Sequence, residues 1–198
     1  LLSESFFAGD VSEEKLDYTL NYKGVAGSET VRSTQVSFYG DSSLRAVHAS
    51  IGPDDAMTRQ ATWKLDLSST EMTYLAQNGL GASRAIDAPV KDSIDNKALS
   101  ETFFKGEVSE EKSDYTLNYK GAAQDQGVRS TQVSFYGVSS LRAGNSLVTP
   151  DDALALQRTF KGEFADVSVV DSAAKYASNK LLSESFFAGD VSEEKLDY

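Results

Sequence analysis

The sequence predicts an α+β protein built from tandem repeats, in which each unit runs roughly β-β-β-α and its strands are antiparallel. The first observation behind this prediction is repetition. Residues 1–18 and 181–198 are identical, and residues 99–121 are a diverged third copy. The second observation is that apolar residues alternate early in each unit, whereas later they recur about every three to four residues. We expect the helix of one unit to run directly into the first strand of the next.

Alignment of the copies divides the chain into a long unit at residues 1–98, a short unit at 99–180, and the start of a further unit at 181–198. Residues 70–83 of the long unit have no counterpart in the short one and are interpreted as an insertion. The identical ends suggest a segment of a longer periodic array. An engineered duplication and one window of a continuous polymer are the alternatives. No Pro/Gly/Ser-rich spacer separates the units, so we expect a semi-rigid arrangement.

Three strands are expected in each unit. In the long unit, Tyr18, Leu20 and Tyr22 alternate with polar residues, which is typical of a half-buried strand. Residues 34–39 are rich in β-branched and aromatic residues and predict the second strand. Residues 63–67 alternate again and predict the third, whose counterpart in the short unit is expected at residues 160–170.

A helix is expected after the third strand. In the long unit it covers residues 90–104, with Pro89 in its first turn and Gly106 as C-cap. In the short unit it extends from an N-cap at Asp171 to a C-cap at Gly189, with Ala174, Ala177 and Leu181 on one face. Under this interpretation Leu1 lies inside a helix. A pair of phenylalanines closes each helix and is expected to fill the core: Phe6-Phe7, Phe103-Phe104 and Phe186-Phe187.

Composition narrows the classes of function. The chain has 198 residues, 40% of them hydrophobic, and a net charge of −11, which disfavours binding to nucleic acid or anionic lipid. The absence of cysteine excludes disulfides, thiolate metal sites and cysteine nucleophiles. No apolar run approaches the roughly 18–20 residues that cross a bilayer, so no membrane insertion is expected. The chain has no signal peptide and begins with Leu1, so we expect the true N-terminus to be missing.

Few residues point to chemistry. His48 is the only histidine and no G-x-S-x-G motif accompanies it, so a turn histidine is favoured over a Ser-His-Asp arrangement. Two Pro-Asp-Asp-Ala sequences, at Asp54-Asp55 and Asp151-Asp152, could offer oxygen ligands to Ca²⁺, but Asp also opens turns and short helices. We favour the turn interpretation and expect no metal and no cofactor.

Other recurring residues suit surfaces. The adjacent acids at Glu13-Glu14, Glu110-Glu111 and Glu193-Glu194 cannot flank a sugar ring as glycoside hydrolysis requires, and predict a solvated acidic face. Gly79-Leu80-Gly81 lacks the Lys-Ser/Thr of a phosphate loop. The tyrosines of the repeated strands either cover half-buried sheet or bind glycans or partner proteins.

We therefore expect a non-enzymatic structural or scaffold protein, extracellular or at a cell surface, that assembles through repeated strand and helix elements with further copies of itself. The alternative is a tandem binding module, an adhesin or linker repeat that recognises a glycan or a protein partner. No catalytic residue is predicted. The residues expected to make assembly contacts are the phenylalanines near the two ends and three residues of the insertion: Phe6, Phe7, Phe186, Phe187, Met72, Tyr74 and Leu75.

Overall fold

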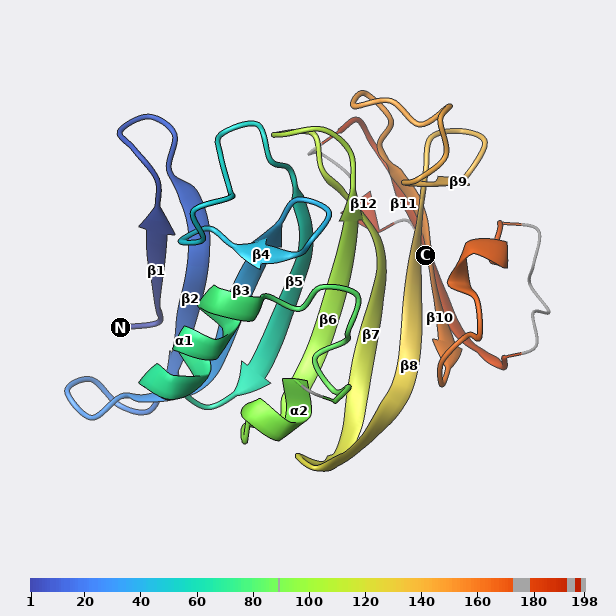
Figure 1. The fold of residues 1–198 in the computed structure, drawn as a ribbon. Helices are drawn as coiled ribbons and strands as arrows, with labels where there is room; N and C mark the ends of the chain where they lie inside the picture. The colour runs from blue at the N-terminus through green and yellow to red at the C-terminus, as the bar shows by residue number, and fades with distance from the viewer. Residues whose placement is uncertain (89, 173–178, 192–194, 197–198) are drawn as a thin grey trace. The chain divides into compact units, whose positions relative to one another are not determined.

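The computed structural model describes residues 1–88, 90–172, 179–191 and 195–196. The chain divides into two compact units: the first comprises Leu1–Glu101 and Lys120–Gln126, and the second Thr102–Tyr119 and Gly127–Tyr198. Both are built on antiparallel strands (Figure 1). The division cuts through three strands, β6, β7 and β8, which therefore contribute residues to both units.

The first unit contains the strand order β1-β2-β3-β5-β6. Its strands are β1 (Ser3–Ala8), β2 (Lys15–Lys23), β3 (Thr30–Tyr39), β5 (Met57–Lys64) and the beginning of β6 (Ala98–Lys105). A short strand, β4 (Leu44–Arg45), also pairs with β3. Val36, Phe38, Ala61 and Trp63 are fully buried and form the core together with Leu75 of the insertion.

The second unit contains the remainder of β6, followed in the strand order by β7, β8, β10, β11 and β12. Its core contains Val133, Phe135, Leu156, Phe160, Phe164 and Val170. The strands are β7 (Lys112–Ala122), β8 (Asp125–Tyr136), β9 (Leu141–Arg142), β10 (Leu154–Lys161), β11 (Leu181–Ala188) and β12 (Lys195–Leu196). Like β4 in the first unit, β9 is a short strand that pairs with the long strand before it.

The predicted β-β-β-α architecture is wrong. The helix expected at residues 90–104 is limited to α2 (Val90–Ser93), and Ala98–Lys105 forms strand β6. The helix expected to extend to Gly189 is replaced over Leu181–Ala188 by strand β11, while residues 173–178, with Ala174 and Ala177, lie outside the described residues. Leu1 likewise precedes a strand, β1.

Strand pairing explains this outcome. β11 lies between β10 and β12, and a helix there would leave the backbone groups on the facing edge of β10 without partners. The glycines expected as helix C-caps instead follow strands. Gly106 has φ 126°, and a Cβ there would lie 2.5 Å from the Glu110 carbonyl oxygen, so the turn requires glycine. Gly189 has the same conformation, with φ 127°.

The strands expected at residues 18–23 and 34–39 are confirmed within β2 and β3. The third strand exists but is displaced: β5 ends at Lys64, and Leu65 has φ 66°. Its counterpart β10 ends at Lys161.

The insertion forms the longest helix of the described chain, α1 (Ser69–Asn78). Ser68 and Glu71 make a capping box, in which the Glu71 Oε2 accepts the Ser68 amide at 2.7 Å. Gly79 ends the helix with φ 58°. In the second unit the 3-10 turn η1 (Val167–Val169) accepts the same kind of hydrogen bond as α1. The Arg45 guanidinium donates to the Met72 carbonyl of α1, and the Arg142 guanidinium donates to the Val167 carbonyl of η1.

Candidate functional site

The three copies of the repeated segment place a glutamate on β1, β6 and β11: Glu4, Glu101 and Glu184. Two of these carboxylates pair with an arginine of the preceding long strand. Arg59 Nη1 lies 3.2 Å from Glu101 Oε1, and Arg158 Nε lies 2.9 Å from Glu184 Oε1. Both arginines are almost fully buried. An arginine–glutamate contact therefore occurs in both units at the recurring glutamate, once on β6 and once on β11, with the arginine two residues apart in the aligned long strands.

Each of these arginines also holds a loop. Arg59 donates to the Ser83 carbonyl at 2.6 Å, and Arg158 donates to the Ser172 carbonyl at the same distance. Glu101 Oε2 accepts the amide of Ala85 at 3.1 Å. Charge-assisted hydrogen bonds of this kind tie the strand to the connection that precedes it. Sequence reasoning missed these residues. When the units are aligned, Arg59 corresponds to Leu156 and Arg158 to Ala61, so only the glutamates recur at matching positions.

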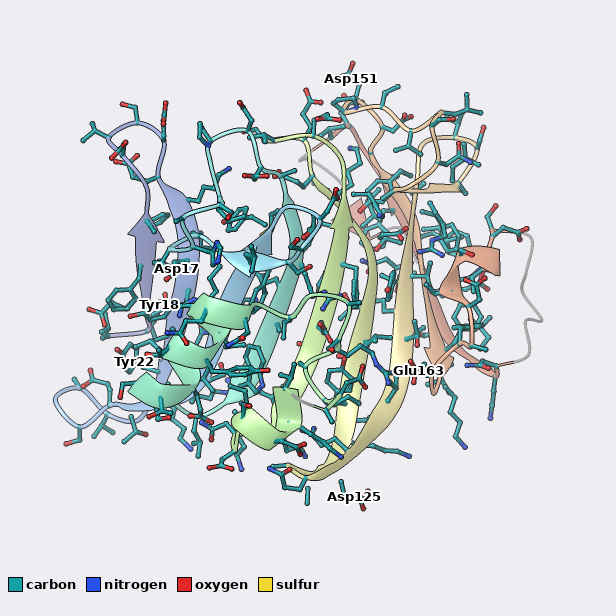
Figure 2. All side chains as sticks on the ribbon, viewed as in Figure 1. Asp17, Tyr18, Tyr22, Asp125, Asp151 and Glu163 are labelled. Atoms are coloured by element: carbon teal, nitrogen blue, oxygen red, sulfur yellow. The ribbon has the colours of Figure 1, made fainter. Side chains whose placement is uncertain are left out.

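The third glutamate has a different environment. Glu4 is exposed on β1, and its Oε2 accepts a hydrogen bond from the Tyr22 hydroxyl at 2.8 Å. Tyr22 lies on β2 (Figure 2), and this hydrogen bond is the main cause that raises the pKa of its phenol above the ordinary value of 10.0. Glu4 is therefore the copy of this glutamate that lies at the surface.

A second buried ion pair also recurs. Asp17 of β2 pairs with Arg45 of β4, and Asp114 of β7 pairs with Arg142 of β9. The two Nε···Oδ1 distances are 3.0 and 2.9 Å. Within the first unit the pair is almost fully buried, whereas Arg142 retains more solvent contact. These pairs anchor the short strands β4 and β9.

The hairpin that begins the chain is reproduced at its end. In β1–β2, Phe7 faces Leu16 and Ala8 faces Lys15. In β11–β12, Phe187 faces Leu196 and Ala188 faces Lys195. Identical sequence thus adopts identical register in both places.

The predicted assembly phenylalanines lie in different environments. Phe6 stacks on Tyr18, with ring centroids 4.3 Å apart, whereas Phe7 is 61% exposed. Phe186 packs against the core of the second unit. Phe187 is half-buried on β11. The structure therefore places only Phe7 of this group openly at the surface.

The insertion residues belong to the interior of the first unit to different extents. Leu75 is fully buried, and Met72 and Tyr74 are half-buried on α1. The end of α1 covers β4, where the Leu80 amide donates to the Ser43 carbonyl at 3.0 Å. That these residues contact a neighbouring molecule remains a prediction.

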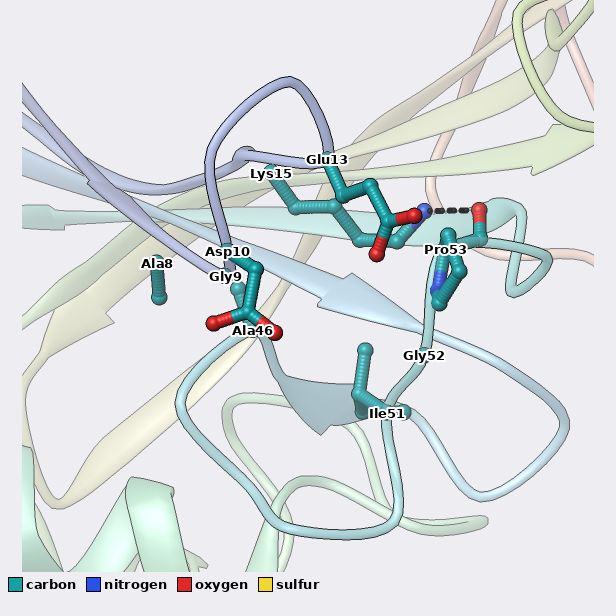
Figure 3. A pocket seen from close by; sticks show the side chains of 9 residues that line it. All are labelled: Ala8, Gly9, Asp10, Glu13, Lys15, Ala46, Ile51, Gly52 and Pro53. Carbon is teal, nitrogen blue, oxygen red and sulfur yellow. Dashed lines mark hydrogen bonds between the residues drawn. The ribbon is translucent and has the colours of Figure 1, made fainter.

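A small cavity of about 190 Å³ lies in the first unit beside the turn that joins β1 and β2. Figure 3 shows Lys15 in its wall, reaching across to the Pro53 carbonyl. The Lys15 ammonium donates to that carbonyl at 2.9 Å and to the Asp55 carbonyl at 2.7 Å. Lys112 makes the same two contacts, with Pro150 and Asp152. This lysine therefore fastens a loop in each unit and is engaged by the protein itself.

A larger cavity of about 520 Å³ lies in the second unit. Tyr115, Leu141, Val170 and the Asp114–Arg142 pair line it. It adjoins β9, and the corresponding strand of the first unit, β4, is the one covered by the end of α1. In the described part of the second unit's connection, η1 stands where the first unit has α1.

The residues considered for catalysis or metal binding make hydrogen bonds within turns. His48 Nδ1 accepts the Ser50 amide at 3.1 Å, and Asn145 Oδ1 accepts the Leu147 amide at 3.0 Å, so both side chains close the same turn. Asp55 accepts the Gly52 amide at 2.8 Å. Asp152 accepts the amide and the hydroxyl of Thr149, which hold the pKa of its carboxyl below the usual range.

The recurring glutamates and tyrosines predicted to lie at the surface have different environments. Glu13, Glu14 and Glu110 are exposed, whereas Glu193 and Glu194 lie outside the described residues. Tyr39 and Tyr136 are buried, and their hydroxyls each donate to a backbone carbonyl at 2.7 Å, so they cover sheet and offer no surface for a ligand. Among the described residues, no cluster of three or more histidine or acidic side chains could hold a metal ion.

No protein family model matches this chain, and neither the curated proteins nor the solved structures include one that is similar to it. In the part of the chain that the structure describes, neither helix is long and apolar enough to cross a membrane.

Proposed function

We propose that this chain is a non-enzymatic structural repeat protein that assembles with further copies of itself through its repeated strands. The observation that carries the proposal is the agreement between β1 and β11: one sequence occurs twice, and the two pairs described in the second copy have the same register as in the first. A strand whose sequence and described hairpin pairs recur is suited to a role in which every unit makes the same junction. An exposed strand edge supplies backbone groups for such a junction.

Light scattering coupled to size exclusion, over a series of protein concentrations, tests this proposal. A mass that increases with concentration, and that the acidic protein retains at moderate salt, supports assembly. A mass that stays at that of one chain throughout contradicts it. Because this measurement requires no assumption about which surface is used, it tests self-assembly whichever residues make the contact.

One observation favours the second candidate, a tandem binding module for a glycan or a protein segment. The cavity of about 520 Å³ in the second unit combines apolar side chains with the Asp114–Arg142 pair, which is the composition expected of a small binding site. Saturable binding of a single glycan or peptide by a monomeric chain, measured by calorimetry and weakened by Leu141→Arg, would favour this candidate. The corresponding Leu44→Arg variant of the first unit, where the end of α1 covers the strand, is the matched control.

A further inference from the structure

We propose that strand β1 of a second copy of this chain takes the place of β11 beside β10, so that copies join head to tail by strand exchange. The proposal rests on the self-assembly proposed above and names its partner and its mode. Its basis is that β1 and β11 have the same sequence, LLSESFFA when the residues before Ser3 are included, and that β10 is the strand that receives it.

Every contact that β11 makes with β10 comes from a residue that the start of the chain also contains. The register pairs Arg158 with Glu184, Leu156 with Phe186 and Phe160 with Leu181. The residues of the second copy that correspond to these three partners are Glu4, Phe6 and Leu1. A strand with this sequence therefore reproduces the ion pair and the apolar contacts without any change of side chain.

Charge complementarity favours this arrangement. Arg158 is buried and requires a carboxylate, because an unpaired guanidinium in such a site is strongly destabilising. Glu184 supplies it within the chain. Glu4 is the corresponding carboxylate at the surface. Among the contacts described, it accepts one exposed hydrogen bond, from the Tyr22 hydroxyl.

The start of the chain also exposes apolar groups that its copy covers. Leu1 is 65% exposed, whereas Leu181 packs against the core of the second unit. Phe7 is likewise exposed, whereas Phe187 is half-buried. In the part of the chain described by the structure, β1 pairs with β2.

The balance between the closed chain and the exchanged chain depends on concentration. In the exchanged chain β10 contacts a strand of the same sequence as in the closed chain. The two states therefore differ in free energy because β11 is covalently attached to β10 and the β1 of a second copy is not. The chain's own β11 competes as a tethered segment, with an effective concentration on the order of 1 mM. Because β1 and β10 are different surfaces, the junction is heterologous and leaves a further β1 and a further β10 available, so it produces open chains of copies.

Substitutions in the full chain test this mechanism by light scattering over a concentration series. Glu184→Lys places a lysine beside Arg158 and weakens the chain's own β11, while Glu4 remains able to replace it. We expect the mean mass of this variant to reach at least about twice that of one chain, at concentrations where the unaltered chain is smaller. Glu4→Lys combined with Glu184→Lys removes both carboxylates, and we expect the mass to return to that of one chain.

A peptide with the sequence of residues 1–18 provides the second measurement. Added to the Glu184→Lys variant, it should occupy β10 and lower the mass to that of one chain plus the peptide. If the single and double variants associate equally, or if the peptide leaves the mass unchanged, the association is non-specific and strand exchange is refuted. The substitutions move the net charge toward zero, so loss of association in the double variant cannot come from greater overall repulsion between the acidic chains.

These outcomes separate this mechanism from the broader proposal. If the unaltered chain assembles and Glu4→Lys alone has no effect on it, self-assembly stands and strand exchange fails. If the unaltered chain remains a monomer at all concentrations while association of Glu184→Lys depends on Glu4, the exchange exists but is not the function of the protein.

Discussion

Arg158 of β10 pairs with Glu184 of β11 across neighbouring strands, at 2.9 Å, and the two residues lie far apart in the sequence. The same pairing joins Arg59 to Glu101 in the first unit. A guanidinium has a planar array of donors, which allows each arginine to bind the carboxylate and a loop carbonyl together. The pair therefore connects three segments: the long strand, the repeated strand, and the loop between them.

Glu101→Ala is expected to destabilise the chain strongly. Glu101 is fully buried, and its removal leaves the charge of Arg59 in the interior without its carboxylate. We expect a loss of about 3–5 kcal/mol in the free energy of unfolding, measured by urea denaturation. Glu4→Ala is the matched control, because this exposed copy should change stability by less than about 0.5 kcal/mol. Equal effects of the two substitutions would contradict the assigned role of the buried pair.

Phenylalanine truncations should divide by environment. Phe186→Ala removes a partly buried ring from the core of the second unit and should cost about 1–3 kcal/mol. Phe7→Ala removes a ring that is mostly in solvent and should cost about 0.5 kcal/mol or less. Thermal unfolding of the two variants under identical conditions measures the difference. A loss at Phe7 as large as that at Phe186 would show that Phe7 is covered in solution, as in an assembly.

The capping box of α1 should contribute measurably. Ser68→Ala removes the side chain that accepts the Glu71 amide, and should lower stability by about 1 kcal/mol. Thr70→Ala, at an exposed position of the same first turn, is the control and should be nearly neutral. Denaturant midpoints compare the two variants. If Ser68→Ala unfolds at the same midpoint as Thr70→Ala, the cap does not stabilise this helix.

The phenol of Tyr22 should ionise at lower pH when Glu4 is replaced. Glu4→Gln removes the charged acceptor that raises the pKa of Tyr22, and this is visible as a shift of the tyrosinate absorbance titration toward lower pH. The sign for stability follows from the raised pKa: the contribution is fully present below the ordinary pKa of 10.0 and disappears as the pH rises through the folded value. In a Tyr22→Phe background the effect of Glu4→Gln on the titration should be much smaller, because only the charge of Glu4 acting on Tyr18 remains. Persistence of the shift there would assign it to another tyrosine.

Much of the organisation could be predicted because repetition and alternation are local properties of the chain. Tyr18, Leu20 and Tyr22 alternate, and they lie on β2. The equivalence of the units extends to single contacts, since His48 and Asn145 accept the same backbone hydrogen bond. The helix α1 was missed, although Ser68 and Glu71 form the S-x-x-E pattern of a capping box and Gly79 follows the helix.

The candidate site was less predictable, because its partners are distant in sequence. Nothing local associates Arg158 with Glu184, or Asp17 with Arg45. Assembly contacts were predicted instead at large apolar residues. Of these, Phe6 stacks within its own hairpin and Leu75 lies in the core.

The sequence by itself determined that the chain is acidic, lacks cysteine, repeats its first segment at its end, and forms strands at residues 18–23 and 34–39. Only the tertiary structure decided that the repeated segment is a strand and not a helix. The segment LSESFF is short and compatible with either state. The strand is favoured because it pairs with the backbone edge of β10 and brings a carboxylate to the buried Arg158. A helix at this place would leave both without partners.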